Sequence, residues 1–209
     1  MKKSSNNHVL SAFFSSSSLS VWRKAFAATR FADYEVVVCE HGGVNEVMGY
    51  CRYCGKPYDA KITDKYGNVH YTEELQESDF AEGNTVVLFR DKPDYQCAPQ
   101  SSCTIDLNGH SLGRISFIAD GKTLILKGGG KMNAIILGYQ DIGSTLVIEQ
   151  TDMYGSQLTV EKLWVNNAVN TRLTNGVFKH IEIAQKGMVI ADLLADGYAF
   201  FNDTAPIYF

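Results

Sequence analysis

The sequence predicts an all-β fold: a short right-handed parallel β-helix with helical caps. A small zinc-knuckle-like module, whose fold a bound metal ion stabilises, precedes it. Short apolar runs separated by glycine- or asparagine-containing turns recur over most of the chain. The runs that start near Thr85, Cys103, Thr123 and Thr145 lie about 18 to 22 residues apart, a spacing that suits one coil of a solenoid. A cluster of cysteine and histidine residues precedes them, in a segment too poor in apolar residues to build its own core.

An antiparallel β-sandwich is the competing fold. Asn108-Gly109 and Asp120-Gly121 between strand-like runs are strong hairpin signals and favour it. The coil spacing favours the solenoid by a narrow margin, and it predicts which side chains stack inside. These inward residues are expected to be Ile105, Leu107, Ile125, Leu146 and Val160.

We divide the chain into three segments. Residues 1–33 are expected to be an unstructured or weakly helical leader, and residues 34–60 form the Cys/His module. Residues 61–209 form the β-helix. A capping helix is expected at 72–80, with Thr72 as N-cap and acidic residues in the first turn, and a second capping helix at about 189–197.

The composition excludes two classes of partner. The formal net charge is -4, whereas a nucleic-acid-binding surface needs a net basic face, so we expect no nucleic acid. No apolar run approaches the roughly 18 residues that span a bilayer, so no transmembrane segment is expected. Met1-Lys2-Lys3 and Ala25-Phe26-Ala27 match the two ends of a secretory signal, but polar residues, including Arg23-Lys24, interrupt the apolar region between them.

Four residues form the candidate metal site: Cys39, His41, Cys51 and Cys54, with the spacing C-x-H-x9-C-x2-C. Residues i and i+2 of an extended strand face the same side, so Cys39 and His41 can share one ion. Three thiolates and an imidazole suit tetrahedral zinc in a closed, structural site without hydrolytic chemistry. The alternative is a disulfide between Cys39 and Cys51 in an oxidising compartment.

Three motifs carry a resemblance to a known family. Cys39-Glu40-His41 with the Gly49–Gly55 segment resembles the short Cys/His modules in large surface proteins of Gram-positive bacteria. Thr104–Leu112 is similar to the first full coil of their pectin-lyase-like β-helix domains, and Ala191–Phe200 to the closing helix. The resemblance covers roughly residues 36 to 203. It implies an extracellular or cell-surface location and an adhesion or glycan-binding role.

For most of the remaining cysteine, histidine, acidic and aromatic residues we expect a structural role. Cys97 and Cys103 form either a disulfide or a pair of part-buried thiols. His110, Asp106 and Asn108 are expected to satisfy backbone groups at a coil corner. The acids of the coil region are dispersed, so we identify no catalytic residue. Tyr139, Tyr154, Trp164 and Phe178 are candidates for stacking on sugar rings, although Trp164 and Phe178 suit the core equally well.

Together these features predict a non-enzymatic, cell-surface or secreted binding module of the adhesion type with a structural zinc. Its expected partner is a glycan or a host or cell-surface protein. The alternative is a carbohydrate-active enzyme, a polysaccharide lyase or glycosidase, on the same scaffold. A glycosidase needs two carboxylates flanking the scissile bond, and stacked coils are able to bring distant acids together.

Overall fold

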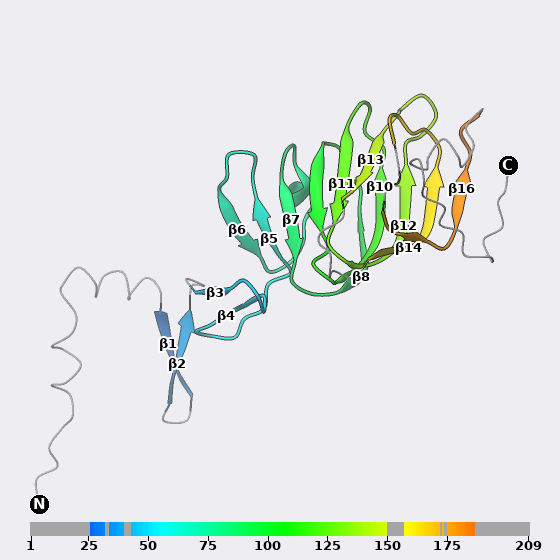
Figure 1. Ribbon diagram of the computed structural model, residues 1–209. Helices are drawn as coiled ribbons and strands as arrows, with labels where there is room; N and C mark the ends of the chain where they lie inside the picture. Colours follow the sequence, from blue (N-terminus) through cyan, green and yellow to red (C-terminus); the bar gives the residue numbers. More distant parts are fainter. Residues whose placement is uncertain are drawn as a thin grey trace, which may run out of the picture. The chain divides into compact units, whose positions relative to one another are not determined.

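The computed structural model describes residues 26–31, 34–39, 43–149, 157–171, 173 and 175–186, the first two ranges by their backbone alone. The chain divides into two compact units, residues 1–57 and residues 58–209. In the described ranges, strands make up nearly all of the regular structure (Figure 1). Among the described residues, only Glu77–Phe80 form a helix, which is of the 3-10 type.

The first unit contains two antiparallel hairpins. Strand β1 (Phe26–Phe31) pairs with β2 (Tyr34–Cys39), and β3 (Val44–Asn45) pairs with β4 (Tyr50–Cys51). Strand β1 lies in the segment expected to be an unstructured or weakly helical leader. The β-branched run of β2 suits a strand and provides the pairing partner for residues 26–31.

The second unit is a parallel β-helix built from two sheets. The first sheet has the strand order β13 (Thr145–Ile148), β11 (Thr123–Lys127), β9 (Cys103–Asp106), β7 (Thr85–Leu88), β5 (Ala60–Thr63) and β6 (Val69–Thr72). The second sheet has the order β14 (Leu158–Val165), β12 (Gly130–Leu137), β10 (Ser111–Phe117) and β8 (Lys92–Cys97), with β15 (Val177–Phe178) and β16 (Ile181–Ile183) both paired to β14. One coil consists of a strand in the first sheet and the next strand along the chain, which lies in the second sheet. The coils are β7–β8, β9–β10, β11–β12 and β13–β14.

The register of the first sheet confirms the coil spacing. Thr85 pairs with Thr104, Thr104 with Ile125, and Ile125 with Val147, which gives steps of 19, 21 and 22 residues. These three pairings are parallel, as a solenoid requires and a sandwich of hairpins does not. The fold is thus a parallel β-helix.

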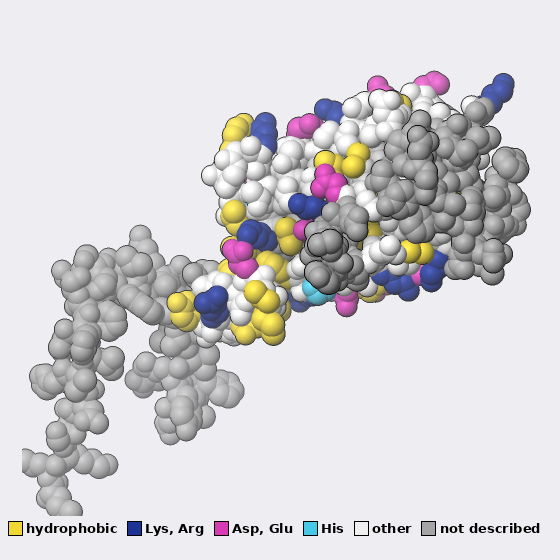
Figure 2. Space-filling view, in the orientation of Figure 1, with side chains coloured by type: hydrophobic (Ala, Val, Ile, Leu, Met, Phe, Trp, Pro, Cys, Tyr) yellow, Lys and Arg dark blue, Asp and Glu magenta, His cyan; other side chains and the backbone are white. Residues whose placement is uncertain are grey.

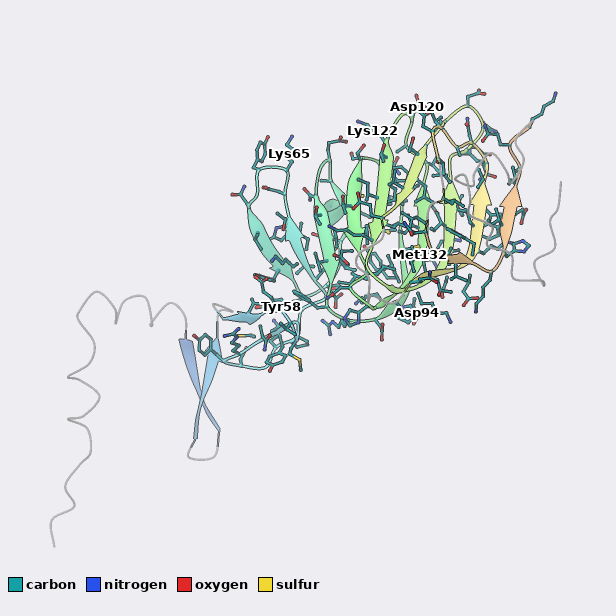
Figure 3. The ribbon with its side chains drawn as sticks, viewed as in Figure 1. Tyr58, Lys65, Asp94, Asp120, Lys122 and Met132 are labelled. Carbon is teal, nitrogen blue, oxygen red and sulfur yellow. The ribbon has the colours of Figure 1, made fainter. Side chains whose placement is uncertain are left out.

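The core lies between the two sheets and consists of stacked aliphatic side chains. Four of the five residues expected inside are fully buried: Ile105, Leu107, Leu146 and Val160. The prediction for Ile125 is wrong, because its side chain is only partly buried and lies on the outer face. Leu124 and Leu126 on either side are the inward residues of β11. Met132 of β12, labelled in Figure 3, lies in the same core.

A hairpin and a short turn form the amino-terminal end of the β-helix, in place of the capping helix expected at 72–80. Thr72 is the last residue of β6 and pairs with Ala60, so it does not begin a helix. Beyond it, the Leu75 N–H donates to the carboxylate of Asp59 at 3.2 Å, which fixes an extended path into the 3-10 turn. Leu75 and Phe80 are buried in the core and cover its open end. The helix expected at about 189–197 lies outside the described residues.

Candidate functional site

The C-x2-C motif lies at a tight turn that follows strand β4. The Gly55 N–H donates to the Cys51 carbonyl at 2.8 Å, and the Cys51 N–H donates to the Lys56 carbonyl at 2.8 Å. Gly55 has φ +73°, a left-handed conformation that glycine adopts without steric cost. This backbone places Cys51 and Cys54 at the two ends of one turn.

The other two predicted metal ligands are less fully described. Cys39 is the last residue of β2, where the structure gives the backbone alone, and His41 lies outside the described residues. In the described part of the chain, no three side chains of His, Cys, Asp or Glu form a group that could hold a metal ion. The four-ligand site therefore stays a prediction.

Burial in residues 43–57 has an unusual distribution. Of these residues only Gly49 and Cys51 are buried. The large apolar side chains nearby face solvent instead: Val47 is 87% exposed, Met48 62% and Tyr53 64%. This segment thus buries one cysteine but leaves its larger hydrophobic side chains exposed, so it has no hydrophobic core of its own.

A second candidate site lies on the outer face of the second sheet. Its outward side chains stack in rows from coil to coil, because the strands are parallel and in register. Two adjacent rows are Ser116–Ile136–Trp164–Glu182 and Arg114–Ala134–Lys162. On the side of the molecule that Figure 2 shows, basic and acidic side chains are intermingled.

Three groups converge on the carboxylate of Glu182 in these rows. The indole Nε1 of Trp164 donates to Oε2 at 2.6 Å, and Lys162 Nζ lies 3.2 Å from the same oxygen. His180 Nε2 lies 3.9 Å from it. The hydrogen bond from Trp164, followed by that from Lys162, holds the pKa of Glu182 below its usual value. Lys162 Nζ also lies 3.9 Å from the centroid of the Trp164 ring, within cation–π range.

A second carboxylate, Glu161, joins three coils. Its Oε1 lies 2.8 Å from Lys179 Nζ and 3.1 Å from Lys131 Nζ. The hydrogen bond from Lys179 is the largest cause of the lowered pKa of Glu161, and that from Lys131 adds to it. Both glutamates are therefore anionic; Glu161 is shared between two lysines, whereas Glu182 contacts one lysine, the indole of Trp164 and His180. A face with fixed donors, fixed acceptors and an indole can hydrogen-bond a polyhydroxylated ligand.

The four aromatic residues singled out in the sequence have different environments. Tyr139 is 51% exposed at a turn, and Phe178 is buried in the core. Trp164 is half-buried on the outer face, and Tyr154 lies outside the described residues. The charged partners of Trp164 were missed from the sequence. Coil arithmetic could have found Glu182, which lies one coil of 18 residues beyond Trp164.

Asp106 and Asn108 satisfy backbone groups at a coil corner, as expected, whereas the His110 side chain lies beside a carboxylate instead. The Asn108 side chain donates to the Leu88 carbonyl of the preceding coil at 3.0 Å, and Asp106 Oδ1 accepts from the Asn108 N–H at 2.9 Å. His110 Nδ1 lies 3.6 Å from Asp91 Oδ1. The Ser111 N–H is the main cause, and His110 a lesser one, of the lowered pKa of Asp91.

Cys97 and Cys103 are free thiols in the structure, not a disulfide. Their exposed fractions are 4% and 3%. Burial raises the pKa of Cys103 to about 12 and raises that of Cys97 as well. They therefore behave as small core residues, in agreement with the second of the two expectations.

Among the described residues, no helix is long and apolar enough to cross a membrane. In comparisons with known proteins, no family model matches the sequence, and no curated protein and no solved structure matches it.

Proposed function

We propose that this protein is a non-enzymatic binding module of the adhesion type, secreted or displayed on a cell surface, that binds glycans on its second sheet. The observation that carries the proposal is the outward Trp164, held by Glu182 and Lys162 on the outer face of the second sheet. Trp combines a large apolar surface with a polar edge, and it is enriched at binding sites for that reason. The resemblance to Gram-positive surface proteins supports the location and leaves a host or cell-surface protein as the other partner class.

The amino-terminal module contains a structural zinc in this proposal. Cys39, His41, Cys51 and Cys54 would complete a tetrahedral shell with no open position. The fit rests on residues 43–57, where Cys51 is fully buried while Val47, Met48 and Tyr53 are exposed. A segment without a hydrophobic core needs a cross-link to stay folded, and a metal ion bound by thiolates provides one.

Three acidic side chains of the coil region accept hydrogen bonds from backbone N–H groups, which supports a structural role for them and not a catalytic one. Asp91 accepts from the Ser111 N–H at 2.7 Å, Glu82 from the Ser102 N–H at 3.1 Å, and Asp120 from the Gly143 N–H at 3.3 Å. These carboxylates stabilise turns between coils. One observation favours the alternative of a carbohydrate-active enzyme: His110 lies beside Asp91, and this pairing suits a general base.

A glycan array with the full-length protein tests the proposal. We expect binding to at least one glycan class, loss of that binding in Trp164→Ala, and its retention in Tyr66→Ala. Tyr66 is a matched control because it is an exposed aromatic residue, at 77%, in the hairpin turn between β5 and β6. Assays for reducing sugars and unsaturated products are run in parallel. Turnover that is lost in His110→Ala, or binding unchanged in Trp164→Ala, contradicts the proposal.

A further inference from the structure

We propose that the last described strands of the β-helix, β15 and β16, form a latch that two carboxylates hold closed and that acid opens while the preceding coils stay folded. The carboxylates belong to Glu161 of β14 and Glu182 of β16, and both strands of the latch pair with β14 (Figure 1). The proposal concerns a conformational change of the fold, so it is independent of the ligand proposed above.

The backbone and core contacts of this latch are weaker than those of the inner coils. β15 pairs with β14 through two residues and β16 through three, whereas β12 pairs with β14 through seven. Ile181 and Ile183 of β16 are partly buried, whereas their partners Leu163 and Val165 are fully buried. Segments with few buried apolar contacts open locally at a lower free energy than the rest of a fold. The latch therefore depends on its side-chain ion pairs.

Glu161 provides the first attachment. Its Oε1 lies 2.8 Å from Nζ of Lys179, which is in the short connection between β15 and β16. The same oxygen lies 3.1 Å from Nζ of Lys131 on β12. One anion thus holds two ammonium groups that come from different coils. When Glu161 is neutral, the two ammonium groups repel each other without a compensating charge.

Glu182 provides the second attachment. Its Oε2 accepts a hydrogen bond from the indole of Trp164 at 2.6 Å and lies 3.2 Å from Nζ of Lys162, and both of these partners are on β14. The Nε2 atom of His180 lies 3.9 Å from the same oxygen. Protonation of this imidazole adds a positive charge beside Glu182. That charge strengthens the latch while Glu182 is ionised and weakens it once Glu182 is neutral.

The sign of the pH dependence follows from these two carboxylates. The hydrogen bond from Lys179 is the largest cause of the lowered pKa of Glu161, and that from Trp164 is the largest cause of the lowered pKa of Glu182. A carboxyl group whose pKa is lower in the folded state stabilises that state above its unfolded pKa, about 4.3 for glutamate, and loses this contribution as the pH falls through the folded value. Both attachments therefore weaken together below about pH 4, and the basic groups left behind repel one another.

Hydrogen exchange of the full-length protein tests the latch. Protection factors, which correct for the pH dependence of intrinsic exchange, are measured from pH 7 to pH 3. We expect residues 177–184 to lose protection about threefold or more near pH 4, a modest change because both carboxylates are partly exposed to solvent. The amides of β10 and β12 should keep their protection. Unchanged protection of residues 177–184, or an equal loss in all coils through global unfolding, overturns the proposal.

Trp164 offers an independent readout of the same change. The chain contains two tryptophans, Trp22 and Trp164, so Trp22→Phe leaves Trp164 as the single emitter. We expect its emission to move to longer wavelength on acidification, because the indole loses the Glu182 carboxylate as its hydrogen-bond acceptor and gains contact with water. The midpoint should match that of the hydrogen-exchange titration. An emission spectrum that stays constant from pH 7 to pH 3, or that changes only with global unfolding, contradicts the proposal.

Neutral variants distinguish the two carboxylates from general effects of acid. Glu161→Gln/Glu182→Gln should show at pH 7 the low protection that the unmodified protein reaches in acid, with no further loss on acidification. Glu149→Gln is the matched control, because Glu149 is an exposed glutamate that follows β13 in the first sheet, and it should keep the normal response. If the double variant unfolds, Lys179→Met replaces it, with lower protection at pH 7 and a smaller loss in acid. A double variant that responds to acid as the unmodified protein does overturns the proposal.

Discussion

The buried carboxylate of Asp59 lies 2.5 Å from Nε of Arg90, and its other oxygen lies 2.5 Å from Nζ of Lys92. Asp59 precedes β5, whereas both cations follow β7, so these ion pairs join the amino-terminal hairpin to the first coil. The Phe89 N–H also donates to the Asp59 carbonyl at 2.9 Å. Asp59 thus adds side-chain ion pairs to the backbone ladder by which β5 pairs with β7.

Replacing Asp59 is expected to destabilise the β-helix. Asp59→Ala removes the carboxylate that two partly exposed cations share, and the expected loss is about 1.5 to 3 kcal/mol, the range for hydrogen bonds to charged groups. Asp94→Ala is the control, because Asp94 is an exposed residue of β8 and its loss should change stability by less than about 0.5 kcal/mol. Urea unfolding measures both; equal midpoints for the two variants would show that the Asp59 cluster contributes little.

Neighbouring residues of β11 should respond in opposite ways to the same substitution. Leu126→Asp puts an unpaired charge into the core and is expected to unfold the second unit, at a cost of several kcal/mol. Ile125→Asp changes an outward side chain and should leave a soluble, folded protein with a loss of about 1 kcal/mol. Solubility and thermal melting distinguish the two, and the reverse ranking would contradict the face assignment.

Zinc is expected at close to one ion per chain in reduced protein. Cys51→Ser and Cys54→Ser should each lower the zinc content, whereas Cys97→Ser should not, because Cys97 is a core thiol of the second unit. Chelation should increase hydrogen exchange in residues 34–60 before the β-helix melts. Elemental analysis that finds reduced, undamaged protein free of zinc would refute the metal site.

Stability should fall as the pH rises above about 9. Burial raises the pKa of Cys103 to about 12 and also raises that of Cys97, so the folded state keeps protons that the unfolded state releases. Between the unfolded pKa, near 9, and the folded value, each thiol therefore lowers stability by about 1.4 kcal/mol per pH unit. Urea unfolding at pH 8, 9 and 10 measures the slope. The double variant Cys97→Ala/Cys103→Ala serves as control, and an identical slope in it would contradict this origin.

The sequence by itself determined an all-β fold and favoured a β-helix over an antiparallel sandwich by a narrow margin. Apolar runs at intervals of one coil require in-register stacking, since only neighbouring coils can bury them. Ile105, Leu107, Leu146 and Val160 could be assigned to the core because each run offers an inward face. The corner role of Asn108 followed from the local hydrogen-bonding chemistry of its side chain. These features depend on the local spacing of apolar residues and on the residue types at turns, both of which can be seen in the sequence.

Only the tertiary structure decided the rest, because it depends on pairings between distant segments. Leu124, Ile125 and Leu126 are consecutive apolar residues, so the sequence does not show which of them face the core. Pairing with β9 and β13 places Leu124 and Leu126 inside and Ile125 outside. Thr72 has the sequence features of a helix N-cap, yet its pairing with Ala60 extends a sheet instead. Trp164 suited core and surface equally well until Glu182, one coil later, held its indole on the outside. These contacts outweigh local propensity because each joins residues that lie 12 to 22 positions apart in the sequence.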